Sequence, residues 1–346
     1  MLWAVVLAGG VGSRFWPVST PSRPKQLLPL AGDLPLIRQT VDRVLPIVDA
    51  HRIRILTGER IARPILDVLP MLAADHLFVE PRARGTAPVL AWAAHEIARR
   101  EPDAVMASLH ADHVITPDAA FRDLLVTMAA ASVRHERLFT IGAVPTRPET
   151  GYGYIRPGEP LDGGEAREVA AFVEKPPPDV AAAYVRDGYL WNTGIFVWPV
   201  RLFLEELKRH TPEIAEHLPL LDRGEIAAYF DAVPPLSVDQ GLLERSRRVA
   251  VMPSTFQWDD VGAWDAMART RPTDEQGNVT FGAAHLVDAE GCIVWADDGA
   301  IAVFGAKDLV VVRTAGVTFV APRDRSADLK KLIEKLPRSL VNPEEG

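Results

Sequence analysis

The chain has 346 residues, of which 48% are hydrophobic and 24% charged, as is typical of a globular protein with one large domain and a smaller one. No apolar stretch approaches the roughly 20 residues that span a bilayer, and no export signal is recognisable, so we expect a cytoplasmic protein without a membrane partner. The formal net charge of −8 argues against a nucleic-acid partner, but a locally positive cleft can still hold a nucleotide.

The first element is an apolar run over residues 2–7, which has the length and character of a buried parallel strand. Three glycines follow within residues 9–12, and backbone N–H groups without neighbouring Cβ atoms can form a concavity that binds anions. Arg14 and Lys25 then add two positive charges. The stretch predicts a polyphosphate-binding loop, although a plain strand-to-helix turn with incidental charges fits the glycines equally well. Neither the Walker pattern nor the dinucleotide pattern, which needs glycine at Phe15, is present.

Apolar runs and helical stripes alternate as far as residue 143. We expect strands at residues 2–7, 52–56, 77–79, 104–109 and 138–143, with helices over residues 36–45, 61–69, 86–97 and 118–132 between them. This alternation predicts an α/β fold with a Rossmann-like, mostly parallel sheet and helices on both faces.

Two strand ends in this half carry candidate functional residues. Segment 80–88 follows the third strand, where Thr86 is expected to be the N-cap of a helix and Pro88 to lie in its first turn. Ligands of open α/β sheets bind at the carboxyl ends of strands, but a plain helix start explains both residues without a ligand.

Asp112 follows the fourth strand, between His110 and His113. An unpaired buried carboxylate costs several kcal/mol, and a bound Mg²⁺ would remove that cost. A transition-metal site is disfavoured because no third ligand stands at a fixed spacing, so we interpret the histidines as flanking residues.

The middle of the chain combines glycines, aromatic residues and polar pairs. Tyr152-Gly153, Glu174-Lys175 and the segment 191–194 each fit a turn, a surface ion pair or a strand edge when taken alone. Further on, Asp259 and Asp260 stand between tryptophans, where Asp260 fits the N-cap of a helix that begins near Ala263.

The C-terminal part changes to short apolar runs at about eight-residue spacing, which predict an all-β unit. The single cysteine, Cys292, lies in one of these runs and is expected to be buried. One helical stripe, beginning near Ser326 and stopped by Pro337, ends the fold, and the final Glu-Glu-Gly is expected to be disordered. We therefore place the domain boundary between residues 1–275 and 276–346.

The opening stretch Gly-Gly-Val-Gly-Ser-Arg-Phe-Trp-Pro, followed by Pro-Lys-Gln, resembles the signature of the sugar-1-phosphate nucleotidylyltransferases. Ser13, Trp16 and Gln26 are similar to the mannose-1-phosphate guanylyltransferase branch of that superfamily. The resemblance covers residues 2–336 and implies a short, left-handed β-helix-like C-terminal domain. His110 stands where that family usually has proline, which sets this chain apart locally.

The resemblance also implies a role for each matching residue. Arg14, Lys25, Asp112 and Asp260 would be catalytic, with Asp112 and Asp260 holding Mg²⁺. The nucleotide-binding residues would be Leu7, Ala8, Gly9, Gly10, Gly12, Ser13, Arg14, Lys25, Gly85, Thr86 and Ala87. The sugar-phosphate-binding residues would be Tyr152, Gly153, Glu174, Lys175, Asn192 and Gly194.

The implied reaction is an Mg²⁺-dependent, in-line attack of mannose 1-phosphate on the α-phosphorus of GTP, which gives GDP-mannose and pyrophosphate. Three alternatives stay open: another manno-configured sugar phosphate such as a heptose 1-phosphate, another base such as that of dTTP or UTP, and a non-catalytic regulatory subunit. The intact Arg14, Lys25, Asp112 and Asp260 argue against the last. A second, isomerase domain is not expected, because only a short segment follows residue 336, and a homodimer is a candidate assembly.

Overall fold

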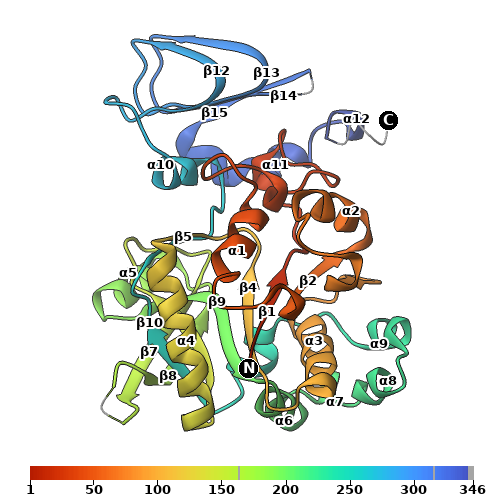
Figure 1. The fold of residues 1–346 in the computed structure, drawn as a ribbon. Helices are drawn as coiled ribbons and strands as arrows, with labels where there is room; N and C mark the ends of the chain where they lie inside the picture. The colour runs from red at the N-terminus through yellow and green to blue at the C-terminus, as the bar shows by residue number, and fades with distance from the viewer. Residues whose placement is uncertain (163, 315, 342–346) are drawn as a thin grey trace.

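The computed structural model describes residues 1–162, 164–314 and 316–341, so the final Glu-Glu-Gly lies outside the described residues (Figure 1). The strands are β1 (Leu2–Leu7), β2 (Ile53–Gly58), β3 (Leu77–Glu80), β4 (Val105–His110), β5 (Val114–Thr116), β6 (Leu138–Ala143), β7 (Gly153–Pro160), β8 (Arg167–Glu174), β9 (Leu190–Pro199), β10 (Val249–Pro253), β11 (Gln257–Asp259), β12 (Val279–Val287), β13 (Ile293–Phe304), β14 (Leu309–Thr314) and β15 (Val317–Pro322). The helices are α1 (Leu36–Val44), α2 (Glu59–Val68), α3 (Thr86–Arg100), α4 (Asp118–His135), α5 (Pro178–Arg186), α6 (Val200–His210), α7 (Pro212–Ala215), α8 (Leu218–Asp222), α9 (Ile226–Ala232), α10 (Met267–Thr270), α11 (Leu329–Ile333) and α12 (Arg338–Val341).

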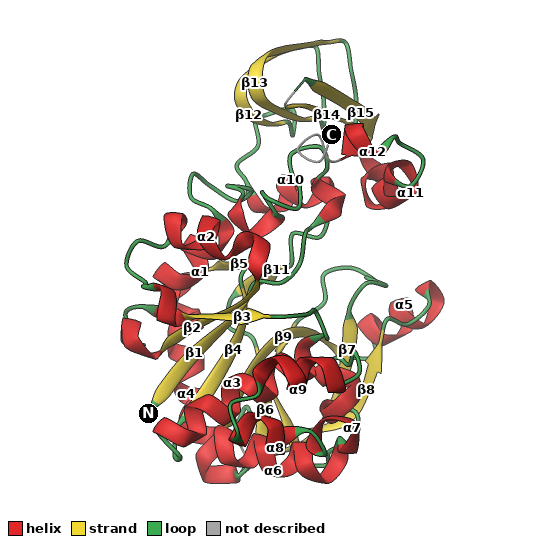
Figure 2. Cartoon of the chain, turned by 90° about the vertical axis from the view of Figure 1, so that its right-hand side faces the viewer, coloured by secondary structure: helices red, strands yellow, loops and turns green. Residues whose placement is uncertain are grey.

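A nine-stranded sheet in the order β3-β2-β1-β4-β9-β6-β10-β8-β7 forms the large domain (Figure 2). Strands β3, β2, β1 and β4 are parallel, as their alternation with helices predicts. Helices cover both faces: Val5 of β1 joins one core with α3 and α6, whereas Ala4 and Val6 join the other with α1, α2 and α4. The predicted fold class is confirmed.

Strand β9 runs antiparallel between β4 and β6, with Val197 opposite both Ala107 and Phe139. The alternation of strands and helices did not predict this insertion. A strand buried on both faces has the same continuous apolar pattern in either direction, so its direction depends on the chain that precedes it.

The C-terminal strands form a separate four-stranded sheet in which β12, β13 and β14 are parallel and β15 is antiparallel to β14. The apolar runs near Ile293 and Ile301 form one bent strand, β13, instead of two. Strand β12 bends at Gly282, where φ is +71° and a Cβ atom would lie 2.0 Å from the carbonyl oxygen of Ala296. Cys292 is buried, as predicted.

Two expected helix caps were wrong. Gly85 occupies the N-cap position of α3, and the Thr86 hydroxyl instead accepts a hydrogen bond from the backbone N–H of Val238 at 2.8 Å. Asp260 caps no helix, because the short 3₁₀ turn Trp264–Ala266 is preceded by Ala263. Within the described residues, every helix is too short or too polar to cross a lipid bilayer.

Candidate functional site

The glycine loop after β1 wraps around Lys25. Gly12 has φ +70°, and a Cβ atom there would lie 2.2 Å from the Cβ atom of Lys25. The Lys25 N–H donates to the carbonyl oxygen of Val11 at 3.1 Å, and the Ser19 hydroxyl donates to the same oxygen at 2.6 Å. Glycine at position 12 is therefore required both for the left-handed backbone and for the close approach of the lysine.

Lys25 joins the two aspartates that stand far apart in the sequence. Its buried ammonium group lies 2.9 Å from Oδ2 of Asp112 and donates to the backbone carbonyl oxygen of Asp260 at 2.5 Å. The short β5–β11 ribbon makes this possible, because it pairs Asp259 with Val114. Burial by itself would raise the pKa of Asp112, but the charge of Lys25 holds it well below its usual range.

The Asp260 carboxylate is held by Tyr152, whereas Lys25 contacts the backbone of Asp260. The Tyr152 hydroxyl donates to its Oδ1 atom, and Arg147 approaches that hydroxyl at 3.4 Å while its guanidinium carbon lies 5.1 Å from the centre of the Trp191 ring. Burial raises the pKa of Asp260 above its ordinary value, against the effects of Lys25 and Tyr152. The Asp260 carboxylate thus has no ion-pair partner among the described residues, and a tyrosine hydroxyl holds one of its oxygens.

Asp259 has a different environment from its neighbour. Its carboxylate lies 2.7 Å from the guanidinium Nε of Arg269 and accepts the N–H of Val261 at 2.7 Å. Asp259 thus stabilises the turn, whereas Asp260 faces the cavity.

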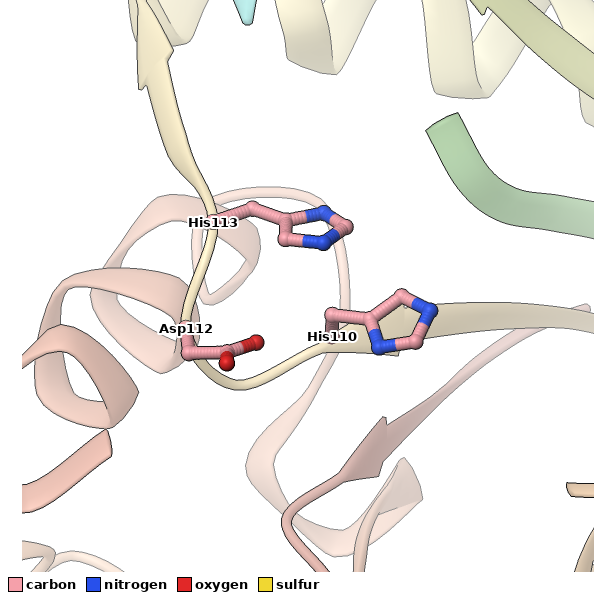
Figure 3. Close-up of side chains that lie close together, drawn as sticks. All are labelled: His110, Asp112 and His113. Carbon is pink, nitrogen blue, oxygen red and sulfur yellow. The ribbon is translucent and has the colours of Figure 1, made fainter. Parts of the chain in front are cut away.

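His110, Asp112 and His113 lie close together, with one potential ligand atom from each within 4.8 Å of the others (Figure 3). The two imidazole rings stack with centroids 4.5 Å apart. The Trp258 indole N–H donates to Nδ1 of His113 at 3.1 Å, so that nitrogen is unavailable to a metal and a neutral His113 carries its proton on Nε2. Burial lowers the pKa of both histidines, which favours the neutral rings. The cluster therefore offers a metal the oxygens of Asp112 better than a set of imidazole ligands.

Most of the predicted nucleotide-binding residues line two adjoining cavities. A cavity of about 290 Å³, here called the base pocket, is lined by Leu7, Ala8, Gly9, Gly10, Gln26, Leu56, Glu80, Ala83, Gly85, Thr86, Val89, His110, Ala111 and Asp112. A second one of about 410 Å³, the phosphate cavity, is lined by Val11, Gly12, Ser13, Arg14, Lys25, His110, Asp112, His113, Asp260, Gly262 and Lys330. His110 and Asp112 line both, so the cavities meet there. Ala87 lines neither of them and donates its N–H to the carbonyl oxygen of Leu236.

Glu80 and Lys330 were not singled out in the sequence. Glu80 ends β3 and lines the base pocket, where a Cβ atom on Gly9 would lie 3.8 Å from its carboxylate. Within the described residues its carboxylate has no hydrogen-bond or ion-pair partner, and burial raises its pKa to about 7. A carboxylate at the carboxyl end of a parallel strand was the available signal for Glu80, whereas Lys330 had none.

The predicted sugar-phosphate residues surround a pair of carboxylates. The Asn192 amide donates to Asp239 at 2.8 Å and accepts from the Thr140 hydroxyl at 3.0 Å. Burial, with a contribution from the charge of Glu174, raises the pKa of Asp239 to about 6. Lys175 lies on the exposed side, 2.5 Å from Glu174.

Two glycines keep this region compact. A Cβ atom on Gly153 would lie 2.6 Å from Oε2 of Glu174, and one on Gly194 would lie 2.6 Å from Nε2 of His110. The second contact connects the strand that carries Asn192 to the phosphate cavity. Tyr152 was predicted to bind the sugar phosphate, but its hydroxyl donates to the Asp260 carboxylate.

Two protein-family patterns and several curated relatives match this chain. The nucleotidyl transferase family pattern matches residues 3–277, and that of the MannoseP isomerase/GMP-like beta-helix domain matches residues 282–336. The chain is 38% identical to the mannose-1-phosphate guanylyltransferase of Escherichia coli K12 over 97% of its own length and 73% of the relative's. It is 36% identical to the alginate biosynthesis protein AlgA of Pseudomonas aeruginosa, with 96% and 71% covered.

Solved structures give the same result. A crystal structure from Thermus thermophilus, named a mannose-1-phosphate geranyltransferase, superposes with a TM-score of 0.88 at 34% identity and covers 96% of this chain and 98% of its own. A putative glucose-1-phosphate thymidylyltransferase from Bacillus anthracis shares the fold, with a TM-score of 0.52 at 18% identity, covering 78% of this chain and 94% of its own. The protein thus belongs to the mannose-1-phosphate guanylyltransferases of the nucleotidyl transferase family.

Proposed function

We propose that the protein transfers GMP from GTP to α-D-mannose 1-phosphate, which yields GDP-mannose and pyrophosphate. The observation that carries this proposal is Lys25, which the glycine loop holds against both Asp112 and Asp260 where the base pocket meets the phosphate cavity. A cytoplasmic location and a homodimer stay predictions.

The chemistry needs no covalent intermediate. An oxygen of the sugar phosphate attacks the α-phosphorus of GTP, the bond to the β-phosphate breaks, and pyrophosphate leaves on the opposite side. Lys25 would stabilise the charge that develops on the α-phosphate, and Arg14, whose guanidinium donates to the carbonyl oxygen of Gly262 at 3.1 Å, would hold the triphosphate. Positioning and charge neutralisation then supply the rate enhancement.

A divalent cation fits the residues of the phosphate cavity. Asp112 and Asp260 present carboxylate oxygens, the ligands that Mg²⁺ prefers, and both residues line this cavity. We propose that these two residues hold Mg²⁺, which when bound would neutralise phosphate charge. Tyr152 would orient the Asp260 carboxylate toward the ion.

Glu80 supports guanine as the base. The N1–H and N2 amino groups of guanine are adjacent donors that match the two oxygens of one carboxylate, and no other common base offers this pair on its pairing edge. An unpaired carboxylate in the base pocket therefore favours GTP over dTTP and UTP. For the sugar, Glu174, Asp239 and Asn192 provide acceptors and a donor for hydroxyls, and a heptose 1-phosphate is the second candidate.

The experiment is pyrophosphate release across a matrix of GTP, ATP, dTTP and UTP against mannose, glucose and heptose 1-phosphates, with Mg²⁺. We expect the highest kcat/KM for GTP with mannose 1-phosphate. A higher value for a heptose phosphate would replace the proposed sugar, and release with no sugar phosphate at all would contradict the transferase.

A further inference from the structure

The helix α11 of the C-terminal part brings a positive charge to the phosphate cavity. Lys330 lines this cavity together with Arg14 and Lys25, although it follows them by some 300 residues. The helix packs against the 3₁₀ turn Ser13–Phe15 where the two parts of the molecule meet (Figures 1 and 2).

One hydrophobic core anchors the backbone next to both cations. Phe15, adjacent to Arg14, and Leu329, adjacent to Lys330, are buried in the same cluster, which also contains Trp264 and Trp295. Because close-packed cores allow little movement, the backbones of Arg14 and Lys330 are both held at the phosphate cavity.

Lys330 differs from its neighbours in that its side chain has no partner. Lys331 lies 2.7 Å from Asp328, and Arg325 lies 2.9 Å from the same carboxyl group. In the part of the chain that the structure describes, the Lys330 side chain makes neither an ion pair nor a hydrogen bond. Its ammonium group is available to a ligand.

Arg14, Lys25 and Lys330 are the arginine and lysine residues that line the phosphate cavity. Lys25 is engaged by Asp112 and by the carbonyl oxygen of Asp260, so Arg14 and Lys330 are the cations of the cavity without a carboxylate partner among the described residues. Both line the phosphate cavity and are absent from the lining of the base pocket. A nucleotide whose base occupies the base pocket would extend its β- and γ-phosphates into the phosphate cavity, where these two cations lie.

We propose that Lys330 binds the β- and γ-phosphates of GTP and the pyrophosphate that they form, so that the C-terminal domain completes the phosphate site. This inference rests on the proposed function. It also gives the small domain a role in substrate binding, because the contact of α11 with the loop is what places the lysine.

The test is calorimetric binding of pyrophosphate, GTP and GMP to the full chain with Mg²⁺, for wild type, Lys330→Ala, Lys330→Arg and the matched control Lys331→Ala. We expect Lys330→Ala to weaken pyrophosphate and GTP binding about tenfold, as for one charge-assisted contact, and to leave GMP binding unchanged. Lys330→Arg should retain most of the affinity, and Lys331→Ala should match wild type.

Two results would overturn the inference: unchanged pyrophosphate affinity in Lys330→Ala, or an equal loss in Lys331→Ala. A melting temperature for each variant separates a lost contact from a damaged fold. If the wild type binds GTP and the Lys330→Ala variant binds it equally well, only the role of Lys330 fails. If the wild type binds no GTP, the proposed function fails with it.

Discussion

The phosphate cavity and the sugar side of the site both contain two carboxylates, but the lysine of each lies in a different place. Lys25 lies between Asp112 and Asp260, and the pKa of Asp112 falls well below its usual range. On the sugar side Asn192 donates to Asp239, the exposed Lys175 pairs with Glu174, and the pKa of Asp239 rises to about 6. A buried cation between carboxylates suits the charged phosphates of a nucleotide, whereas acceptors with a cation only at the exposed edge suit the hydroxyls of a sugar phosphate.

The largest expected effect comes from removing that cation. Lys25→Ala should lower kcat by about 10²–10³-fold, because the contact strengthens as charge develops on the α-phosphate. GTP binding should weaken less than turnover does, which steady-state kinetics and calorimetry measure separately. An equal loss of GTP affinity with unchanged kcat would show that Lys25 serves binding alone.

Asp260→Asn should abolish the metal-dependent activity, with a loss of about 10²-fold or more, because an amide is a poorer ligand and carries no charge. The check is a Mn²⁺ titration followed by electron paramagnetic resonance, alongside the rate as a function of Mg²⁺. A variant that keeps its activity at an unchanged Mg²⁺ requirement would remove Asp260 from the metal site.

Tyr152→Phe tests the support of that carboxylate. We expect about a tenfold higher Mg²⁺ requirement, since a hydrogen bond to a charged group contributes about 1.5–3 kcal/mol. Tyr154→Phe is the matched control, because its hydroxyl bonds to the backbone of Glu149 instead. Equal Mg²⁺ dependence in both variants would refute the positioning role of Tyr152.

Glu80→Gln should reduce the preference for GTP over ITP, which lacks the N2 amino group, by about tenfold. In the wild type the KM for GTP should rise as the pH falls below about 7, where Glu80 becomes protonated. A preference that is unchanged in the variant would exclude Glu80 from base recognition.

The smallest expected effect concerns Asp239. Its folded pKa of about 6 lies above the ordinary 3.8, so its contribution makes the folded state less stable as the pH rises through that window. Asp239→Asn should remove this slope from melting temperatures measured between pH 4 and 7. A slope identical to wild type would contradict the raised pKa.

The two regions also differ in how far the sequence predicts them. The glycine loop and Asp112 follow from local pattern, because each comes directly after a buried strand, whereas Lys25 was assigned from its charge near the loop and from the family resemblance. The meeting of Asp112 with Asp260 depends on β5 and β11, and three-residue strands are too short to show a periodicity. Lys330 reaches the cavity only because Leu329 packs with Phe15, a contact between the two ends of the chain that no local pattern encodes. Family resemblance, not periodicity, assigned the sugar-side residues.

In the proposed reaction the phosphate cavity promotes a single displacement without a protein nucleophile. The most direct measurement uses GTP that carries sulfur at one stereochemically defined position on the α-phosphorus, with ³¹P NMR of the resulting thio-GDP-mannose. We expect inversion of configuration at phosphorus. Retention would contradict the single displacement, because two successive displacements require a covalent intermediate on a protein side chain, for which Lys25, His110 and His113 lie beside Asp112.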